Sequence, residues 1–143
     1  LEKFNTDALL NKIVAYLPES PPYFDKDTLT DRPERFFVSE IIREKIFLYY
    51  SKEIPYSTEV IVESFTEEPG INKIRAFINV ERESQKGSII GHKGAMLKKT
   101  GTAARLDIEE FLGKKAYLEV YVKVKDNWRS NTTQLKQFGY DNQ

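Results

Sequence analysis

Ser88-Ile89-Ile90-Gly91-His92-Lys93-Gly94-Ala95-Met96-Leu97-Lys98-Lys99 is the stretch that decides the fold. An apolar pair precedes a turn bounded by two glycines, and an apolar and basic helix start follows that turn. Glycines let the backbone turn tightly and approach a ligand with no Cβ in the way. The helix that follows directs its positive N-terminal end to the same place. The stretch therefore predicts a loop that holds a phosphate chain, with an ordinary turn between two helices as the competing interpretation.

Composition narrows the class of protein. The 143 residues are 40% hydrophobic and 31% charged, which is typical of a soluble globular domain. The absence of cysteine and the single histidine, His92, exclude disulfides and thiolate or multi-histidine metal sites. No apolar run approaches the roughly 18 residues of a membrane span. Residues 1–17 are amphipathic and contain acids, unlike a signal peptide, so a cytoplasmic location is expected.

Charge is distributed unevenly along the chain. The formal net charge is zero, yet residues 84–105 contain five basic residues and no acid, and the remainder has 17 basic against 22 acidic residues. A positive patch on an otherwise acidic protein is typical of a nucleic-acid partner. The alternative is a solvated helix face.

Hydrophobic periodicity predicts the order of elements. Helices are expected at 1–17, 31–50, 86–90 and 95–112, strands at 58–65, 71–82 and 116–125, a proline-rich linker at 18–28, and a short helix at 130–138. In the second helix, Arg43, Glu44 and Lys45 are expected to face outward. Gly101 weakens the helix at 95–112, so the start of that helix is expected to be irregular.

The order from residue 31 indicates the fold. Alternating side chains in the strands predict a sheet covered on one face only. The order α-β-β-α-α-β is that of a type II KH domain, an α+β fold with a three-stranded sheet and helices packed on one face.

Separate motifs in the correct order carry a family resemblance. Leu29-Thr30-Asp31-Arg32-Pro33-Glu34-Arg35-Phe36, Val80-Glu81-Arg82-Glu83-Ser84-Gln85-Lys86 and Phe138-Gly139-Tyr140 flank the glycine turn. Over about residues 17–140 the chain resembles the C-terminal half of the bacterial GTPase Era family. The resemblance implies a KH domain at 29–143 that binds the single-stranded 3′ end of small-subunit ribosomal RNA during subunit assembly. It also implies a cytoplasmic protein that associates peripherally with the inner membrane.

The chain departs from the family pattern in the motifs that bind GTP. The chain has neither a Gly-x-x-x-x-Gly-Lys-Ser/Thr loop nor a guanine-selecting Asn-Lys-x-Asp motif. GTP and magnesium are therefore expected only in a GTPase domain that this chain lacks, with residues 1–17 as the last helix of that domain. We expect no enzyme activity and no cofactor in this chain, since the acidic pairs Glu67-Glu68 and Glu109-Glu110 have no evident partner base.

The residues expected to contact RNA gather at the glycine turn. They are Lys86, Ile89, Ile90, Gly91, His92, Lys93, Gly94, Met96, Leu97, Lys98 and Lys99. The glycines admit the backbone, the cations attract phosphate, and the apolar side chains form a floor for bases.

Competing interpretations accompany these roles. They are core packing for Ile89, Ile90 and Leu97, an exposed loop position for His92, and a surface ion pair for Arg105. The alternative function is a protein-interaction or regulatory module that docks a GTPase domain or ribosomal proteins, supported by Tyr23 and Phe24 in the linker.

Overall fold

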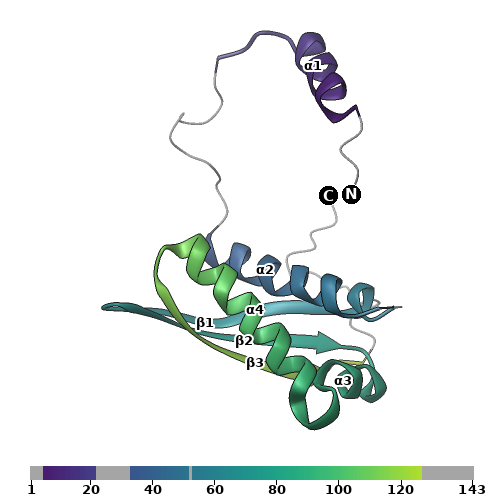
Figure 1. The fold of residues 1–143 in the computed structure, drawn as a ribbon, viewed down its shortest axis with the longest axis vertical. Coiled ribbons are helices and arrows are strands. Elements are labelled where there is room, and N and C mark those ends of the chain that lie inside the picture. Colours follow the sequence, from purple (N-terminus) through teal and green to yellow (C-terminus); the bar gives the residue numbers. More distant parts are fainter. Residues whose placement is uncertain (1–4, 22–32, 52, 127–143) are drawn as a thin grey trace. The chain divides into compact units, whose positions relative to one another are not determined.

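The computed structural model describes residues 5–21, 33–51 and 53–126, and the chain divides into two units after Asp31 (Figure 1). The predicted linker from residue 22 onward and the predicted helix at 130–138 lie outside the described residues.

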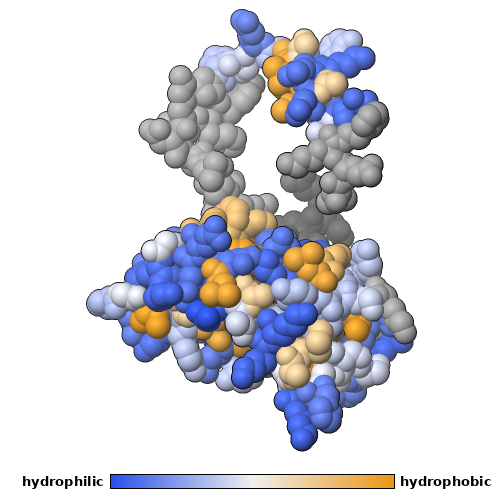
Figure 2. Space-filling view, in the orientation of Figure 1, coloured by the Kyte–Doolittle hydropathy of each residue, from blue (hydrophilic) through white to orange (hydrophobic). Residues whose placement is uncertain are grey.

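The described part of the first unit contains one helix, α1 (Thr6–Tyr16), where the sequence predicted a helix at 1–17. None of its residues is buried, and hydrophobic side chains line one side of it (Figure 2). These side chains are 48 to 63% exposed, and they are Leu9, Leu10, Ile13, Val14 and Leu17.

The second unit is an α+β domain. Its elements are α2 (Glu34–Tyr49), η1 (Pro55–Ser57), β1 (Glu59–Glu68), β2 (Ile71–Val80), α3 (Glu83–Ile90), η2 (His92–Gly94), α4 (Ala95–Leu112) and β3 (Lys115–Val124). The sheet has the order β1-β2-β3, in which β1 pairs antiparallel and β3 pairs parallel with β2. The predicted order α-β-β-α-α-β is confirmed.

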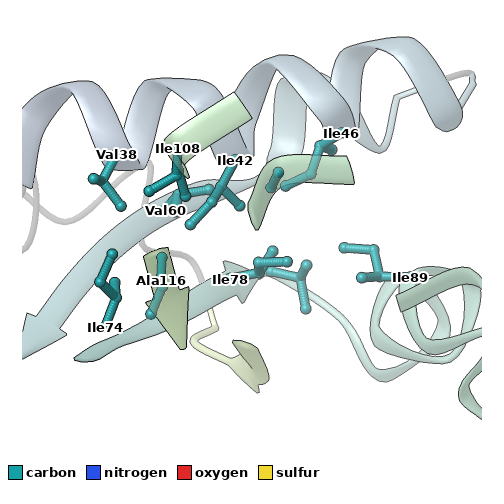
Figure 3. Packing of buried hydrophobic residues seen from close by; sticks show 12 residues of the cluster. Val38, Ile42, Ile46, Val60, Ile74, Ile78, Ile89, Ile108 and Ala116 are labelled. Carbon is teal, nitrogen blue, oxygen red and sulfur yellow. The ribbon is translucent and has the colours of Figure 1, made fainter. Parts of the chain in front are cut away.

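Alternate residues of the central strand build the core. Ile74, Ala76, Ile78 and Val80 of β2 are at most 2% exposed, because they point toward the helices. Figure 3 shows isoleucines of α2 and α4 packing above this row, and Ile89 of α3 entering the same cluster. Burial of such side chains contributes about 1.5–3 kcal/mol each, so this layer is the main source of stability.

A β-bulge interrupts the predicted alternation of side chains in β1. The register with β2 shifts between Val62 and Ser64, so Phe65 packs against the core on the same face as Val60 and Val62. The inserted residue restores a hydrophobic face that strict alternation would have turned to solvent. The strand consequently continues to Glu68, beyond its predicted end at residue 65.

Lys45 does not face outward as predicted. The residue is 8% exposed, and its Nζ pairs with the carboxylate of Asp107 in α4 and lies 3.0 Å from Glu44 Oε2. The hydrogen bond to Asp107 is the main reason why the pKa of Lys45 is raised above its usual value. This ion pair joins α2 to α4.

The start of α4 is also regular, contrary to the prediction. The helix is continuous through Gly101 and ends at Gly113, which adopts the left-handed conformation with φ 62°. A glycine in an unbroken helix costs about 1 kcal/mol relative to alanine, so its role must be sought in packing.

Candidate nucleic-acid interface

The loop at residues 91–94, the glycine loop, turns through three positive φ angles. Gly91 has φ 71° and ψ −177°, Lys93 has φ 49°, and Gly94 has φ 79°. A Cβ on Gly91 would lie 2.8 Å from Cβ and Cγ of Met96, so no larger residue fits there without movement. Lys93 is a non-glycine residue in the left-handed region, a strained conformation that is concentrated at functional sites.

The N-terminus of α4 follows the loop directly. The first backbone N–H groups of an α-helix lack intrahelical acceptors, and the helix dipole makes that end positive. His92 and Lys93 of the loop are exposed beside it. Loop and helix start therefore present donors and positive charge on one side of the domain, an arrangement suited to a phosphate chain.

A groove runs from the glycine loop between α4 and β3, and we call it the α4–β3 groove. Its volume is about 360 Å³. The residues that line it are Gly94, Leu97, Lys98, Gly101, Thr102, Arg105, Leu118 and Val120. Apolar side chains thus come from both walls, and two cations come from α4.

Two features make this groove accessible to a ligand. Gly101 presents only hydrogen to the opposite wall, where a Cβ would lie 3.9 Å from Cγ2 of Val120. The other wall, β3, is an edge strand of the described sheet and pairs with β2 alone. An edge strand leaves backbone N–H and C=O groups for a further partner.

The predicted residues take different positions relative to the groove. Gly94, Leu97 and Lys98 line the groove, and Gly91, His92 and Lys93 form the loop beside it. Ile89 is fully buried in the core, as in the competing interpretation, so it supports the loop from below. Ile90 and Met96 are half-buried at the two ends of the loop.

Two predicted lysines have partners away from the groove. Lys99 Nζ lies 4.4 Å from the ring centroid of Tyr49 in α2, a cation–π contact. Lys86 Nζ lies 3.9 Å from Glu83 Oε2 within α3. Lys93 and Lys98 are therefore the predicted lysines placed at the loop and in the groove.

Five of the eight residues that line the groove were not among the predicted contact residues. Arg105 forms the expected ion pair, with Nη1 2.7 Å from Glu109 Oε1, yet it also lines the groove. Gly101, Thr102, Leu118 and Val120 were not predicted as site residues either. Helical spacing could have found the first wall, because residues 94, 97, 98, 101, 102 and 105 follow the i, i+3, i+4 pattern of one face.

Glu109 ties the end of α4 to the start of β3. Its carboxylate accepts hydrogen bonds from the backbone N–H of Ala116 at 3.1 Å, from Lys115 Nζ at 3.0 Å and from Arg105 Nη1 at 2.7 Å. These donors, the Ala116 amide foremost, lower the pKa of Glu109 to about 2. The charged carboxylate thus holds Arg105 at the groove and closes the α4–β3 connection.

Two other kinds of site are absent from the part of the chain that the structure describes. There, no cluster of three or more His, Cys, Asp or Glu side chains could hold a metal ion. In the same ranges no helix is long and apolar enough to cross a membrane.

Comparison with known proteins identifies relatives of this chain. The model of the KH domain family matches residues 53–129. GTPase Era of Geotalea daltonii is 54% identical over 138 residues, which cover 96% of this chain and 46% of that protein. GTPase Era of Thermoanaerobacter pseudethanolicus is 49% identical over 142 residues, which cover 98% of this chain and 47% of that protein. The chain thus spans about half the length of these curated relatives.

Solved structures agree with this resemblance. A complex of Era with MgGDPNP and nucleotides 1506–1542 of 16S ribosomal RNA superimposes with a TM-score of 0.89 at 39% identity, over 96% of this chain and 47% of that one. Era of Aquifex aeolicus bound to GDP and aluminium fluoride gives the same values. The predicted type II KH architecture and the resemblance to Era are confirmed.

Proposed function

Because this chain belongs to the KH domain family, we propose that it binds single-stranded RNA through the glycine loop and the α4–β3 groove. The observation that carries the proposal is the continuity of these two features. A groove with apolar walls begins at Gly94, where a strained loop and a helix N-terminus present positive charge.

Each part of the site has a physical role in this proposal. The glycine loop admits the sugar-phosphate chain, and Lys93 and the α4 amides neutralise phosphates. Leu97, Leu118 and Val120 offer surfaces on which unpaired bases lie. Lys98 and Arg105 border the groove, and the free edge of β3 supplies backbone groups that recognise base edges.

The relatives suggest which RNA this is. One superimposed Era structure contains nucleotides 1506–1542 of 16S ribosomal RNA. We propose that this chain binds the 3′ end of small-subunit ribosomal RNA within an Era-type protein, in the cytoplasm. GTP and magnesium would then bind in a GTPase domain of that protein, with α1 as its last helix, and small-subunit assembly would be the context.

Fluorescence anisotropy of a labelled RNA matching that 3′ end tests the proposal, with a scrambled RNA beside it. We expect preferential binding that weakens with salt. Replacing His92 and Lys93 together by Asp should abolish most of this binding while leaving the thermal midpoint nearly unchanged. Absence of binding to either RNA, or an equal loss of stability and binding in the variant, contradicts the proposal.

A protein-docking function has a separate observation in its favour. Leu48 and Tyr56 are 63% and 71% exposed, and the Tyr56 ring meets Phe47 edge-on at 5.4 Å. These side chains lie outside the α4–β3 groove, whereas Tyr23 and Phe24 lie outside the described residues. If the chain binds no RNA, this apolar surface becomes the first place to substitute.

A further inference from the structure

Tyr50 connects α2 to the base of the glycine loop. It follows the last residue of α2, and its hydroxyl donates a hydrogen bond to the carbonyl oxygen of Ile89 at 2.8 Å. The Tyr50 hydroxyl oxygen also lies 3.0 Å from Oγ1 of Thr100, whose single proton can be donated either to that oxygen or to the carbonyl oxygen of Met96 at 2.9 Å. Burial raises the pKa of the Tyr50 hydroxyl, so the group stays protonated and able to donate at neutral pH.

The two carbonyls lie on opposite sides of the loop. Ile89 precedes Gly91 by two residues, and Met96 follows Gly94 by two residues. The carbonyl of Ile89 belongs to the last turn of α3, where carbonyl oxygens have no N–H donor within the helix. Since Ile89 is fully buried, the Tyr50 hydroxyl satisfies a carbonyl that would otherwise be unpaired away from water.

The surroundings of these bonds are closely packed. Thr100 is 1% exposed, and Tyr50 packs against the hydrophobic core. Met96 also abuts Gly91, where no Cβ fits. The hydroxyl pair therefore bridges the end of α3 and the start of α4, the two segments that the glycine loop connects.

We propose that Tyr50 and Thr100 are positioning residues that hold the glycine loop in its RNA-binding conformation before RNA arrives. A loop with Lys93 in the left-handed region relaxes toward other conformations unless its ends are held. Part of the binding free energy would then be lost in ordering the loop. Neither residue lines the α4–β3 groove, so each acts through the loop. The inference rests on the proposed function.

The test combines RNA affinity with amide exchange on the whole 143-residue chain. Tyr50→Phe and Thr100→Val each remove one hydroxyl and keep the shape, and Thr100→Ser keeps the hydroxyl. Ile74→Val, in the same core but on β2, is the control for lost stability. All affinities are measured at a temperature where every variant is folded.

We expect Tyr50→Phe and Thr100→Val to weaken RNA binding about 3- to 10-fold, the size of one hydrogen bond. The double variant should lose less than the product of the two factors, because the residues act as one unit. Loop amides at 91–97 should exchange faster by a similar factor, measured by NMR. Thr100→Ser should keep the affinity of the parent chain. Ile74→Val should lower the thermal midpoint without changing RNA affinity or the exchange of the loop amides.

Three results would overturn the inference. Unchanged affinity and exchange in Tyr50→Phe would show that the loop needs no such support. A loss of affinity in Ile74→Val as large as that in Tyr50→Phe would reduce the hydroxyl pair to a general stabiliser. If the parent chain binds no RNA, the proposed function fails, and amide exchange alone tests the positioning role. Faster exchange confined to residues 91–97 in Tyr50→Phe and Thr100→Val then supports that role, and unchanged exchange contradicts it.

Discussion

Lys93 combines charge with an unusual backbone conformation. Its φ of 49° and ψ of 30° lie in the left-handed region, which costs a non-glycine residue about 1–2 kcal/mol. Glycine would relieve that strain, and asparagine would tolerate it. The presence of lysine at this exposed position therefore favours a role for its ammonium group over a role in stability.

The residue makes a sharp test of the site. Lys93→Asn should weaken RNA binding about tenfold, the size of a charge-assisted hydrogen bond, while stability stays equal or rises. Lys12→Asn, which removes the same charge from exposed α1, is the matched control. Anisotropy and thermal unfolding on both variants check the prediction, and equal effects at the two positions would contradict it.

The two loop glycines differ in what surrounds them. Both have positive φ, but a Cβ at Gly91 would lie 2.8 Å from Met96, whereas a Cβ at Gly94 meets nothing within 4 Å. Gly94→Ala should cost about 1–2 kcal/mol of unfolding free energy from backbone strain. Gly91→Ala should cost at least about 1 kcal/mol more through overpacking. Urea unfolding of both variants measures the difference, and equal costs would mean that Met96 moves freely.

At the scale of elements, Gly101 shows a conflict between helix stability and groove shape. Gly101→Ala should stabilise α4 by up to about 1 kcal/mol. The added methyl group narrows the groove toward Val120, so RNA affinity should fall by roughly fivefold, about 1 kcal/mol. Gly87→Ala in α3, where a Cβ meets nothing within 4 Å, is the control that should gain stability and keep affinity. Urea unfolding measures the change in stability, and fluorescence anisotropy measures the change in RNA affinity. Unchanged affinity in Gly101→Ala would show that RNA binds outside the α4–β3 groove.

Glu109 makes the connection between α4 and β3 sensitive to pH. Its pKa falls from 4.5 to about 2 on folding, so the folded state binds fewer protons than the unfolded state between these values. Its stabilisation is therefore complete above about pH 4.5 and is lost as the pH falls toward 2. The parent chain should lose more stability over this interval than Glu109→Gln does.

Urea unfolding at a series of pH values measures this difference. The adjacent and exposed Glu110 provides the control, since Glu110→Gln should keep the steep acid dependence of the parent chain. Parallel curves for the parent chain and Glu109→Gln would show that the carboxylate contributes nothing to stability.

At the scale of the whole molecule, charge is balanced overall and concentrated locally. The formal net charge is zero, while residues 84–105 contain five basic residues and no acid. Binding should therefore depend on the few phosphates at the glycine loop. For about three phosphates on a single strand, the log-log slope of affinity against salt should be near −2, at roughly −0.7 per phosphate. Titrations at several salt concentrations measure the slope, and a flat dependence would remove the electrostatic part of the proposal.

Most of the architecture could be predicted because it depends on local patterns. Alternation in β2 and helical spacing in α2 repeat over enough residues to identify each element without its neighbours. The glycine loop was evident for a similar reason, since a tight turn with positive φ favours glycine wherever it occurs.

The errors arose where a neighbour decides the environment of a side chain. Lys45 lies on a polar stretch of α2, and its burial is favourable because it pairs with Asp107 of α4 as well as with the adjacent Glu44. The bulge in β1 depends on pairing with β2, which no pattern within β1 specifies. Gly101 weakens a helix in isolation, yet α4 is unbroken because it is packed against the sheet.

The sequence by itself determined the α+β class, the order of elements, the glycine loop and the local excess of positive charge. Only the tertiary structure placed Leu118 and Val120 opposite α4, buried Ile89 beneath the loop and turned Lys99 toward Tyr49. The physical reason is that backbone conformation follows from short-range sterics and periodicity, whereas a groove is the space left between elements distant in sequence.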